Sequence, residues 1–374
     1  MRVGVFNPTF NVYGGGEFVA AVIANTLAQN GHDVVLFCNE KINQFNLKNF
    51  FGTSLHPSIK EIINSTFFKP TNGLLAFYQN IFRSYVANLK TDIWIDVFSN
   101  CVFPWTKISY IHFPFLNTQN YSLRFPYLKY PHTLQTGALP YVIFEKTLFN
   151  PNHKLVISNS KYTENEIKKN SGIKSTVLYP PIPSVFFDNK IKDFEKKEKE
   201  NLVVTVSRFD PSKGLEKIPY IASLTDNDVH FVIIGRLHTK KTLLSLKNLT
   251  EKFGLTDRIH FHSDISRTEM KKILKRAKIY LHTKVGEHFG ISIVEGMAMG
   301  CVTLAHDSGG IREFVPENLR YQSITEAAEI ISREISMWNP QKVVENIQRA
   351  EKFREENFSK EFINLFDRYL NKIL

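Results

Sequence analysis

Short apolar runs alternate with amphipathic stretches along the first half of the chain, and glycine-rich turns separate them. The run RVGVFNP (2–8) precedes a glycine cluster, the helical stretch FVAAVIANTLAQNG (18–31) and a second apolar run, HDVVLFCN (32–39). This order predicts a β–α–β unit, and therefore a parallel sheet with a right-handed crossover. Further strands are predicted for DIWIDVFS (92–99), KISYIHF (107–113) and KLVISNS (154–160), and a helix over about 161–170.

The second half repeats the pattern after a Lys- and Glu-rich stretch at 189–201, which predicts a solvated linker. Strands are predicted for five runs, with helices between them: NLVVTVSRF, VHFVIIG, RIHFHSD, IYLHTK and CVTLAHD. The sequence therefore predicts an α/β fold of two doubly wound, Rossmann-like domains facing a cleft, at 1–182 and 183–355. The last residues, 356–374, are predicted to form a helix that crosses back to the first domain. Ligands of such sheets bind beyond the carboxyl ends of the strands.

The segment GEHFGISIVEGMAMG (286–300) runs from the end of a predicted strand into a predicted helix. Helix N-termini bind anions through free amides and the helix dipole. Glu287 would precede the turn, and Glu295 would lie one turn into the helix. A phosphorylated sugar or a nucleotide would suit this set, whereas a capped helix with two solvated glutamates is the alternative. The amides placed at the helix start belong to Phe289, Gly290, Ile291 and Ser292.

Two cations follow the strand NLVVTV in the loop SRFDPSKG (207–214). Arg208 and Lys213 would suit a pyrophosphate, Arg through its planar fork and Lys as a mobile point charge. A surface turn with solvated charges is an equally good interpretation of this loop alone.

The glycine cluster YGGGE (13–17) resembles a phosphate cradle between the first strand and helix. It has neither the GxGxxG spacing of dinucleotide sites nor the GK[ST] of P-loops. Gly14, Gly15 and Gly16 permit close approach of a ligand to the backbone. A tight β–α turn is the alternative.

Histidines and acidic pairs give weaker indications. His112 ends a predicted strand of the first domain, where it would face the cleft, although a lone histidine is more often structural. His260 and His262 share one strand face without a visible third ligand, and the DND sequence at 226–228 precedes its strand instead of following it. We therefore expect no metal and no other cofactor.

The chain carries a formal charge of +11, of which residues 1–182 hold +7, from 16 Lys and Arg against 9 Asp and Glu. Such an excess favours nucleic acid, anionic lipid or anionic small molecules as partners. No nucleic-acid-binding motif accompanies it, so we expect no nucleic-acid partner. Aromatic residues interleaved with Lys and Arg over 65–90 and 121–144 are typical of a membrane interface or of ordinary core packing.

Cysteine usage and hydropathy indicate a cytoplasmic protein. The three cysteines are far apart in the sequence, which fits a reducing compartment. We expect no signal peptide, because the first residues enter a strand directly. No run approaches the roughly 20 apolar residues that span a bilayer, so any membrane attachment is expected to be peripheral.

Taken together, these motifs resemble the GT-B glycosyltransferases of family 4 along nearly the whole chain. The resemblance rests on the E-x7-E segment EHFGISIVE, the SRFDPSKG loop, GGGE, SNSKYT and YPP. Within that family, YGGGE, DIWIDVFS, YIHFPF, LYPP, EHFGISIVEGMA and LAHDSGG are most similar to the α-1,2-mannosyltransferases that extend the lipid-linked oligosaccharide of N-glycosylation on the cytosolic face.

The resemblance implies a retaining hexosyltransferase that uses a nucleotide-sugar donor, GDP-mannose above all, and a glycan or polyprenyl-linked glycan acceptor. Arg208 and Lys213 would neutralise the diphosphate, Glu287 would contact the sugar, Glu295 would bind the ribose, and His112 would lie beside the sugar. The amides of residues 289–292 would support the sugar and phosphates, and Gly14–Gly16 would approach the diphosphate or the acceptor. Phe18 departs from the family pattern, which usually has Arg there.

Other functions of the same fold stay open. A UDP-sugar-dependent transferase acting on a glycolipid or polysaccharide, a sugar-nucleotide epimerase and a phosphorylase would share it. A catalytically silent GT-B binding subunit is a further alternative, although the four charged residues Arg208, Lys213, Glu287 and Glu295 are all present. Neither the sugar, the base nor the acceptor follows from these residues alone.

Overall fold

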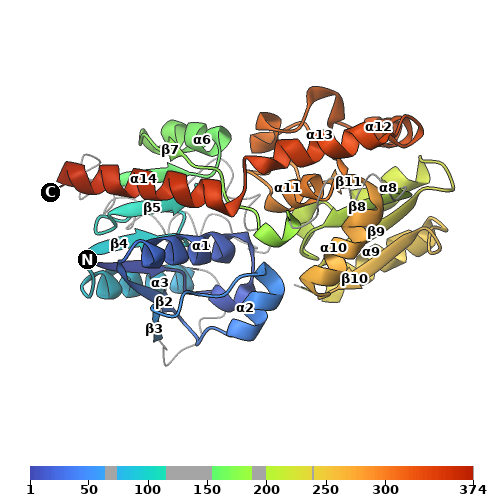
Figure 1. Cartoon of the computed structure of the whole chain (residues 1–374). Coiled ribbons are helices and arrows are strands. Elements are labelled where there is room, and N and C mark those ends of the chain that lie inside the picture. Colours follow the sequence, from blue (N-terminus) through green and yellow to red (C-terminus); the bar gives the residue numbers. More distant parts are fainter. Residues whose placement is uncertain (64–73, 115–153, 188–198, 238–239, 374) are drawn as a thin grey trace. The chain divides into compact units, whose positions relative to one another are not determined.

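A computed structural model describes residues 1–63, 74–114, 154–187, 199–237 and 240–373 (Figure 1). The chain forms two compact units. The first domain comprises residues 1–181 and 355–374, and the second domain comprises residues 182–354. Of the two basic, aromatic segments, 121–144 lies outside the described residues, as do residues 65–73 of the other.

The first domain is built on a parallel sheet of seven strands in the order β3-β2-β1-β4-β5-β6-β7. The order runs outward in both directions from the β1–β4 pair, as in a doubly wound fold. The strands are β1 (Arg2–Phe6), β2 (Asp33–Cys38), β3 (Lys60–Ile63), β4 (Ile93–Asp96), β5 (Ile108–Ile111), β6 (Leu155–Ser158) and β7 (Thr176–Val177).

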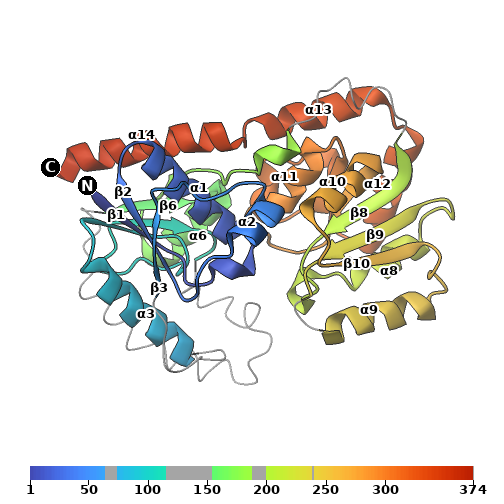
Figure 2. The same ribbon diagram turned by 60° about the horizontal axis from the view of Figure 1, so that its bottom comes forward.

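Helices cover both faces of this sheet (Figure 2). Alternate residues of β1 and β2 pack on opposite sides: Val3 and Val34 join the core with α1 (Gly15–Gln29) and α14 (Glu355–Ile373). Phe6 and Phe37 join a second core with Ala87 of α3 (Leu74–Asn88). The remaining helices are α2 (Gln44–Phe51) and α6 (Lys161–Ser171).

Helix α1 is buried on nearly every side, in keeping with the mostly apolar run FVAAVIA within it. It lies on the sheet and is covered in turn by α14, whose Phe358, Phe362 and Phe366 belong to the same core. The end of the chain therefore completes the core that its beginning starts. The helix predicted at 356–374 does belong with the first domain.

The second domain has a parallel sheet of six strands in the order β10-β9-β8-β11-β12-β13. Its strands are β8 (Glu200–Val206), β9 (His230–Gly235), β10 (Ile259–Ser263), β11 (Ala277–His282), β12 (Val302–His306) and β13 (Arg320–Tyr321). Its helices are α8 (Lys217–Ser223), α9 (Lys240–Lys252), α10 (Arg267–Arg276), α11 (Ile291–Ala298), α12 (Ile324–Ser336) and α13 (Pro340–Glu351). Helix α11 packs against α13, and α12 packs against α8.

The predicted fold class, two doubly wound parallel sheets, is confirmed. Three strands, β3, β7 and β13, were not predicted, because β7 and β13 have only two residues each and β3 contains no buried residue that would mark an apolar run. The predicted linker was too long at its carboxyl end. Lys199 is buried and Glu200 begins β8, so the charged stretch there enters the sheet instead of lying in solvent.

Candidate active site

Two loops meet at the carboxyl edge of the second sheet, because β8 and β11 are neighbouring parallel strands. The β8 loop (207–214) and the β11 loop (283–290) bond to each other directly, since the Thr283 hydroxyl donates to the Lys213 carbonyl at 2.9 Å. Gly214 has a φ of +67°, and a Cβ there would lie 2.9 Å from the Thr283 carbonyl oxygen. The glycine thus serves both the turn and the close approach of the two loops.

The Glu287 carboxylate lies among three basic side chains. Its Oε1 is 3.2 Å from Lys284 Nζ, and its Oε2 is 3.4 Å from His282 Nε2 and 3.7 Å from Lys213 Nζ. Glu287 and Lys213 are only 14% and 18% exposed, so the pair is screened from bulk water. The structure therefore brings together Lys213 and Glu287, which the sequence placed in separate motifs.

These contacts perturb both charges. Burial alone would raise the pKa of Glu287, but the positive charges of Lys284 and Lys213 hold that pKa well below its usual range. Burial lowers the pKa of Lys213 to about 8; Glu287 opposes this shift, whereas Lys284 and Arg208 add to it. The site is thus a carboxylate embedded in excess positive charge, which suits a polyanionic ligand.

Arg208 is the second residue of the β8 loop, which also contains Lys213. Its side chain is exposed and forms no ion pair with the described residues. Gly235, at the end of β9, allows the start of the β8 loop to lie against β9, because a Cβ on this residue would lie 1.8 Å from the Ser207 carbonyl oxygen. Arg208 is therefore accessible to solvent, whereas Lys213, on the same loop, is partly buried.

Helix α11 begins beside this carboxylate, as predicted. Gly290 is its N-cap with a φ of 91°, so the turn requires glycine. Ser292, in the first turn, accepts a hydrogen bond from Tyr280 at 2.8 Å. Gly296 permits the helix to lie on the Tyr280 ring, because a Cβ there would be 2.7 Å from it. Phe289 is buried against Phe314 and Phe353, which leaves its backbone as its contribution to a site.

Glu295 is 3% exposed and pairs with Arg267 at 2.5 Å. Burial raises the pKa of Glu295, and the charge of Arg267 opposes that shift. Arg267 begins α10, directly beyond the carboxyl end of β10, so this ion pair lies on the ligand side of the sheet. Its guanidinium also stacks over the Phe186 ring at 5.1 Å. A ribose contact for Glu295 stays a prediction, now with Arg267 as the group that orients the carboxylate.

In the first domain, the glycine cluster forms the N-terminus of α1. Gly14 is the N-cap, and its amide donates to Glu17 Oε2 at 2.9 Å. The other Glu17 oxygen accepts from the Thr9 hydroxyl at 3.0 Å. Gly15 is exposed, and a Cβ on Gly16 would lie 3.3 Å from His112 Nε2. The cluster and His112, which are far apart in the sequence, are therefore neighbours at one edge of the first sheet.

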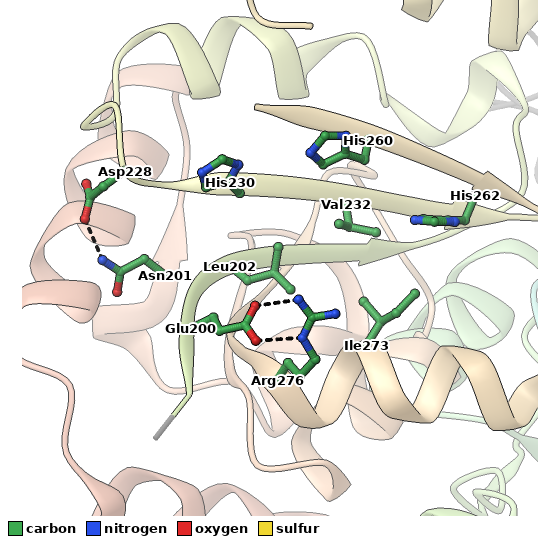
Figure 3. Close-up of a pocket in the computed structure, with 10 residues that line it drawn as sticks. All are labelled: Glu200, Asn201, Leu202, Asp228, His230, Val232, His260, His262, Ile273 and Arg276. Atoms are coloured by element: carbon green, nitrogen blue, oxygen red, sulfur yellow. Dashed lines mark hydrogen bonds and ion pairs between the residues drawn. The ribbon is translucent and has the colours of Figure 1, made fainter. Parts of the chain in front are cut away.

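A solvent-open pocket of about 620 Å³ lies elsewhere on the second domain (Figure 3). Figure 3 shows its floor on β8, β9 and β10, with His230 and His260 stacked 6.3 Å apart, and a Glu200–Arg276 ion pair at its wall. Glu200 and His230 are the first residues of their strands. The pocket therefore lies at the opposite end of the sheet from Glu287 and is not part of the candidate site.

Among the described residues, no three His, Cys, Asp or Glu side chains are grouped so that they could hold a metal ion. Among the same residues, no helix combines the length and apolar character needed to cross a bilayer.

Three site residues were missed from the sequence. His282 and Lys284 follow β11 at the ligand edge and could have been found by the rule that polar residues at carboxyl ends of strands form sites. Arg267 carries a weaker signal, a cation in the first turn of a helix, where the dipole disfavours positive charge.

The chain is similar in sequence and in fold to known proteins. Residues 186–352 match the family model described as Glycosyl transferases group 1. A GDP-Man:Man(3)GlcNAc(2)-PP-Dol alpha-1,2-mannosyltransferase of Dictyostelium discoideum is 28% identical over 247 residues, covering 59% of this chain and 48% of the relative. The mouse protein of the same name is 34% identical over 170 residues, covering 42% and 34%. The Candida albicans protein is 24% identical over 369 residues, covering 82% and 60%.

The chain spans about half the length of the first of these curated relatives. Solved structures match over nearly the whole chain and show the fold. Sucrose-phosphate synthase from Thermosynechococcus elongatus has a TM-score of 0.76 at 16% identity, covering 99% of both chains. HepE from Anabaena, crystallised with UDP and glucose, has a TM-score of 0.73 at 17% identity, covering 98% of this chain and 100% of its own. The resemblance inferred from the motifs is confirmed to this extent: the chain has the GT-B fold, and its residues 186–352 form a domain that matches the group 1 glycosyltransferases.

Proposed function

We propose that the chain transfers mannose from GDP-mannose to a lipid-linked glycan, with retention of the anomeric configuration. The observation that carries the proposal is the pairing of Glu287 with Lys213 and Lys284 at the ligand edge of residues 186–352, with Arg208 on the same loop as Lys213. Excess positive charge beside a carboxylate suits a donor that combines a diphosphate with sugar hydroxyls. The names of the curated relatives support mannose and guanosine over other sugars and bases.

The roles follow from the chemistry of the groups. Arg208 and Lys213 stabilise the charge that develops on the departing diphosphate, with Lys284 as a third cation. Glu287 accepts hydrogen bonds from hydroxyls of the transferred sugar, and the amides at the start of α11 support sugar and phosphate. Gly14–Gly16 approach the diphosphate or acceptor from the first domain. The acceptor hydroxyl attacks the face from which the diphosphate leaves, and the diphosphate takes up its proton.

This division of charge requires no metal ion, because the cations of the chain take the place of a divalent ion at the diphosphate. We accordingly propose that transfer is independent of metal and of any other cofactor. A chelator such as EDTA is expected to leave the rate unchanged, and a rate restored only by added divalent ions would contradict this part of the proposal.

Two observations support the proposed acceptor and the proposed location of the protein. The curated relatives are named for a dolichol-linked acceptor. On the first domain, Phe82 and Tyr85 of α3, with Leu89 just beyond it, are 66%, 45% and 67% exposed at helical spacing. Together with the basic excess of this part of the chain, that surface suits peripheral contact with an anionic membrane on the cytoplasmic face.

A panel of sugar nucleotides tests the donor. The purified protein is incubated with GDP-mannose, UDP-glucose, UDP-galactose and UDP-N-acetylglucosamine, and both donor hydrolysis and the shift of Tm are measured. GDP-mannose is expected to give the largest effect in both, and NMR of a transfer product to show an α-linkage. Turnover of a UDP-sugar in place of GDP-mannose would overturn the proposed donor but not the match of residues 186–352 to the group 1 glycosyltransferases.

A further inference from the structure

The loop that follows β4 is held by the last residue of that strand. Asp96 is buried, and its Oδ1 accepts from the amides of Phe98 and Ser99 at 2.9 and 2.8 Å. Asn100 then adopts a φ of 55°, and its Nδ2 donates back to the Phe98 carbonyl at 2.9 Å. The loop 97–100 is therefore a closed, locally bonded turn at the ligand edge of the first sheet.

This turn holds the main chain of His112. Asn100 Oδ1 accepts from the amides of His112 and Phe113 at 2.8 and 3.1 Å, just beyond the end of β5. From the other side, Asn159 Nδ2 donates to the His112 carbonyl at 2.9 Å. Beyond the end of β5, two asparagine side chains thus make the main-chain hydrogen bonds that a neighbouring strand would otherwise make. His112 is therefore held in place although it lies outside the strand.

The same turn determines the state of the His112 ring. Nε2 lies 3.1 Å from the Val97 carbonyl oxygen, which can only accept, so Nε2 carries the proton. Burial lowers the pKa of His112 to about 4, so the ring is neutral at physiological pH. Nδ1 has no hydrogen-bond partner among the described residues, and it is not among their buried unsatisfied atoms. The lone pair of the neutral ring is therefore on Nδ1, whereas Nε2 is the ring nitrogen that faces Gly16.

We propose that Asn100 is a positioning residue that holds His112 in the Nε2–H tautomer, with Nδ1 as a hydrogen-bond acceptor for a hydroxyl of the sugar substrate. The inference rests on the proposed sugar-transfer function and deepens it. His112 then accepts a hydrogen bond from the substrate without transferring a proton. Asn100 affects turnover without touching the substrate.

The tautomer can be measured without any activity. Long-range ¹H–¹⁵N NMR spectra of ¹⁵N-histidine-labelled full-length protein are recorded at pH 5 to 8, and His112→Asn identifies the signal among the 12 histidines. The expected result is a neutral ring with Nε2 protonated at every pH in that range. A second tautomer is expected in Asn100→Gly, which keeps the left-handed conformation but removes the acceptor oxygen. A protonated ring at pH 7, or an unchanged tautomer in Asn100→Gly, would overturn the proposal.

Kinetics test the role toward the sugar. The amide oxygen of Asn can replace Nδ1, whereas that of Gln reaches the Nε2 position. His112→Asn is therefore expected to lose about tenfold in kcat and His112→Gln about 100-fold, the range of one hydrogen bond. Asn100→Gly is expected to lose about tenfold in kcat, and Asn100→Asp, which keeps Oδ1, to recover most of it. Asn227→Gly, in an exposed turn of the second domain, controls for the substitution.

The two sets of data separate the possible failures. If His112→Gln is faster than His112→Asn, or if Asn100→Gly keeps the wild-type rate, the positioning role is wrong. If the wild type transfers no sugar, the proposed function fails, while the NMR result still decides whether Asn100 controls the tautomer of His112.

Discussion

Lys213 and Glu287 form a partly buried ion pair, with 3.7 Å between Nζ and Oε2, although the resemblance assigns one to the diphosphate and the other to the sugar. Each residue comes from a separate loop, and β8 and β11 bring the two loops together. Glu287 thereby neutralises charge that a diphosphate would otherwise neutralise. In the proposed complex, donor binding would exchange one anionic partner of Lys213 for another.

Removal of the cations tests this arrangement. Lys213→Ala and Arg208→Ala are each expected to lower kcat by about 10² to 10³, because preorganised contacts to a leaving group act mainly in the transition state. Initial rates with saturating GDP-mannose give the measurement. Lys241→Ala, an exposed lysine of α9, is the matched control. If both variants turned over at the wild-type rate, the leaving-group role would be wrong.

The pKa of Lys213, lowered to about 8, predicts an alkaline limit of activity. The ammonium form is lost as the pH rises through this value, so kcat/KM is expected to fall above about pH 8. Bound diphosphate favours the charged form, so the decline of kcat itself should lie at higher pH. Lys213→Arg keeps its charge and should abolish the decline. A pH profile of kcat/KM that is flat from 7 to 9.5 in the wild type would contradict the assignment.

Asp96 predicts a dependence of stability on pH. Burial raises the pKa of its carboxyl group from 3.8 to about 6, so the folded state holds its proton more tightly than the unfolded state. Its contribution to the free energy of unfolding is fully present below pH 4 and is lost as the pH rises through 6, by at most about 1.4 kcal/mol per unit. Asp96→Asn keeps an acceptor oxygen but does not titrate. Urea denaturation from pH 4 to 7 should show the wild type losing stability relative to the variant; parallel curves would show that Asp96 does not titrate in this range.

Lys199 stabilises helix ends at the amino-terminal side of the second sheet. Its buried Nζ donates to the carbonyl oxygens of Lys275, Ala277 and Met299 at 3.1, 2.9 and 2.9 Å. Lys199→Met leaves these acceptors without their donor and is expected to cost about 3 kcal/mol of unfolding free energy. Chemical denaturation checks this value, with Lys252→Met at the exposed end of α9 as control. A loss below about 0.5 kcal/mol would contradict the structural role.

The exposed apolar face of α3 predicts membrane contact. The triple variant Phe82→Ser, Tyr85→Ser, Leu89→Ser is expected to lose at least about tenfold in affinity for vesicles of phosphatidylcholine and phosphatidylserine, measured by co-sedimentation. Phe45→Ser removes an aromatic side chain of α2 that is 74% exposed and should bind as the wild type does. Equal binding by the triple variant would exclude this face, and binding that is independent of salt and phosphatidylserine would exclude the electrostatic part.

The sequence was sufficient to predict the architecture and to place the motifs of the second domain at the carboxyl edge of its sheet. Hydrophobic runs marked the longer strands, and the carboxyl-end rule placed Lys213 and Glu287 on one side of one sheet. Those inferences depend only on chain order and strand direction. The roles of the individual side chains toward sugar, ribose and diphosphate stay predictions.

The remaining features depend on distances between side chains from separate loops. Lys284 and Arg267 acquire their importance from the carboxylates that they face. Their positions at strand and helix ends can mark them as candidate site residues, but no local pattern reveals which carboxylate each one pairs with. Asn100 is a similar case: an asparagine in a turn is unremarkable until its left-handed conformation directs Oδ1 at the end of another strand. Hydrophobic periodicity contains no information of this kind.

The return of α14 to the first domain has a consequence for how the chain folds. The first domain takes its core from both ends of the chain, whereas the second domain is continuous. Where the chain enters and leaves the second domain, Ile182 and Arg354 form a β-bridge, so its two ends are fastened together. During synthesis the second domain can therefore mature while the first still lacks the helix that covers α1. The emergence of α14 from the ribosome, and not the order of the domains, then sets the time at which the first domain is completed.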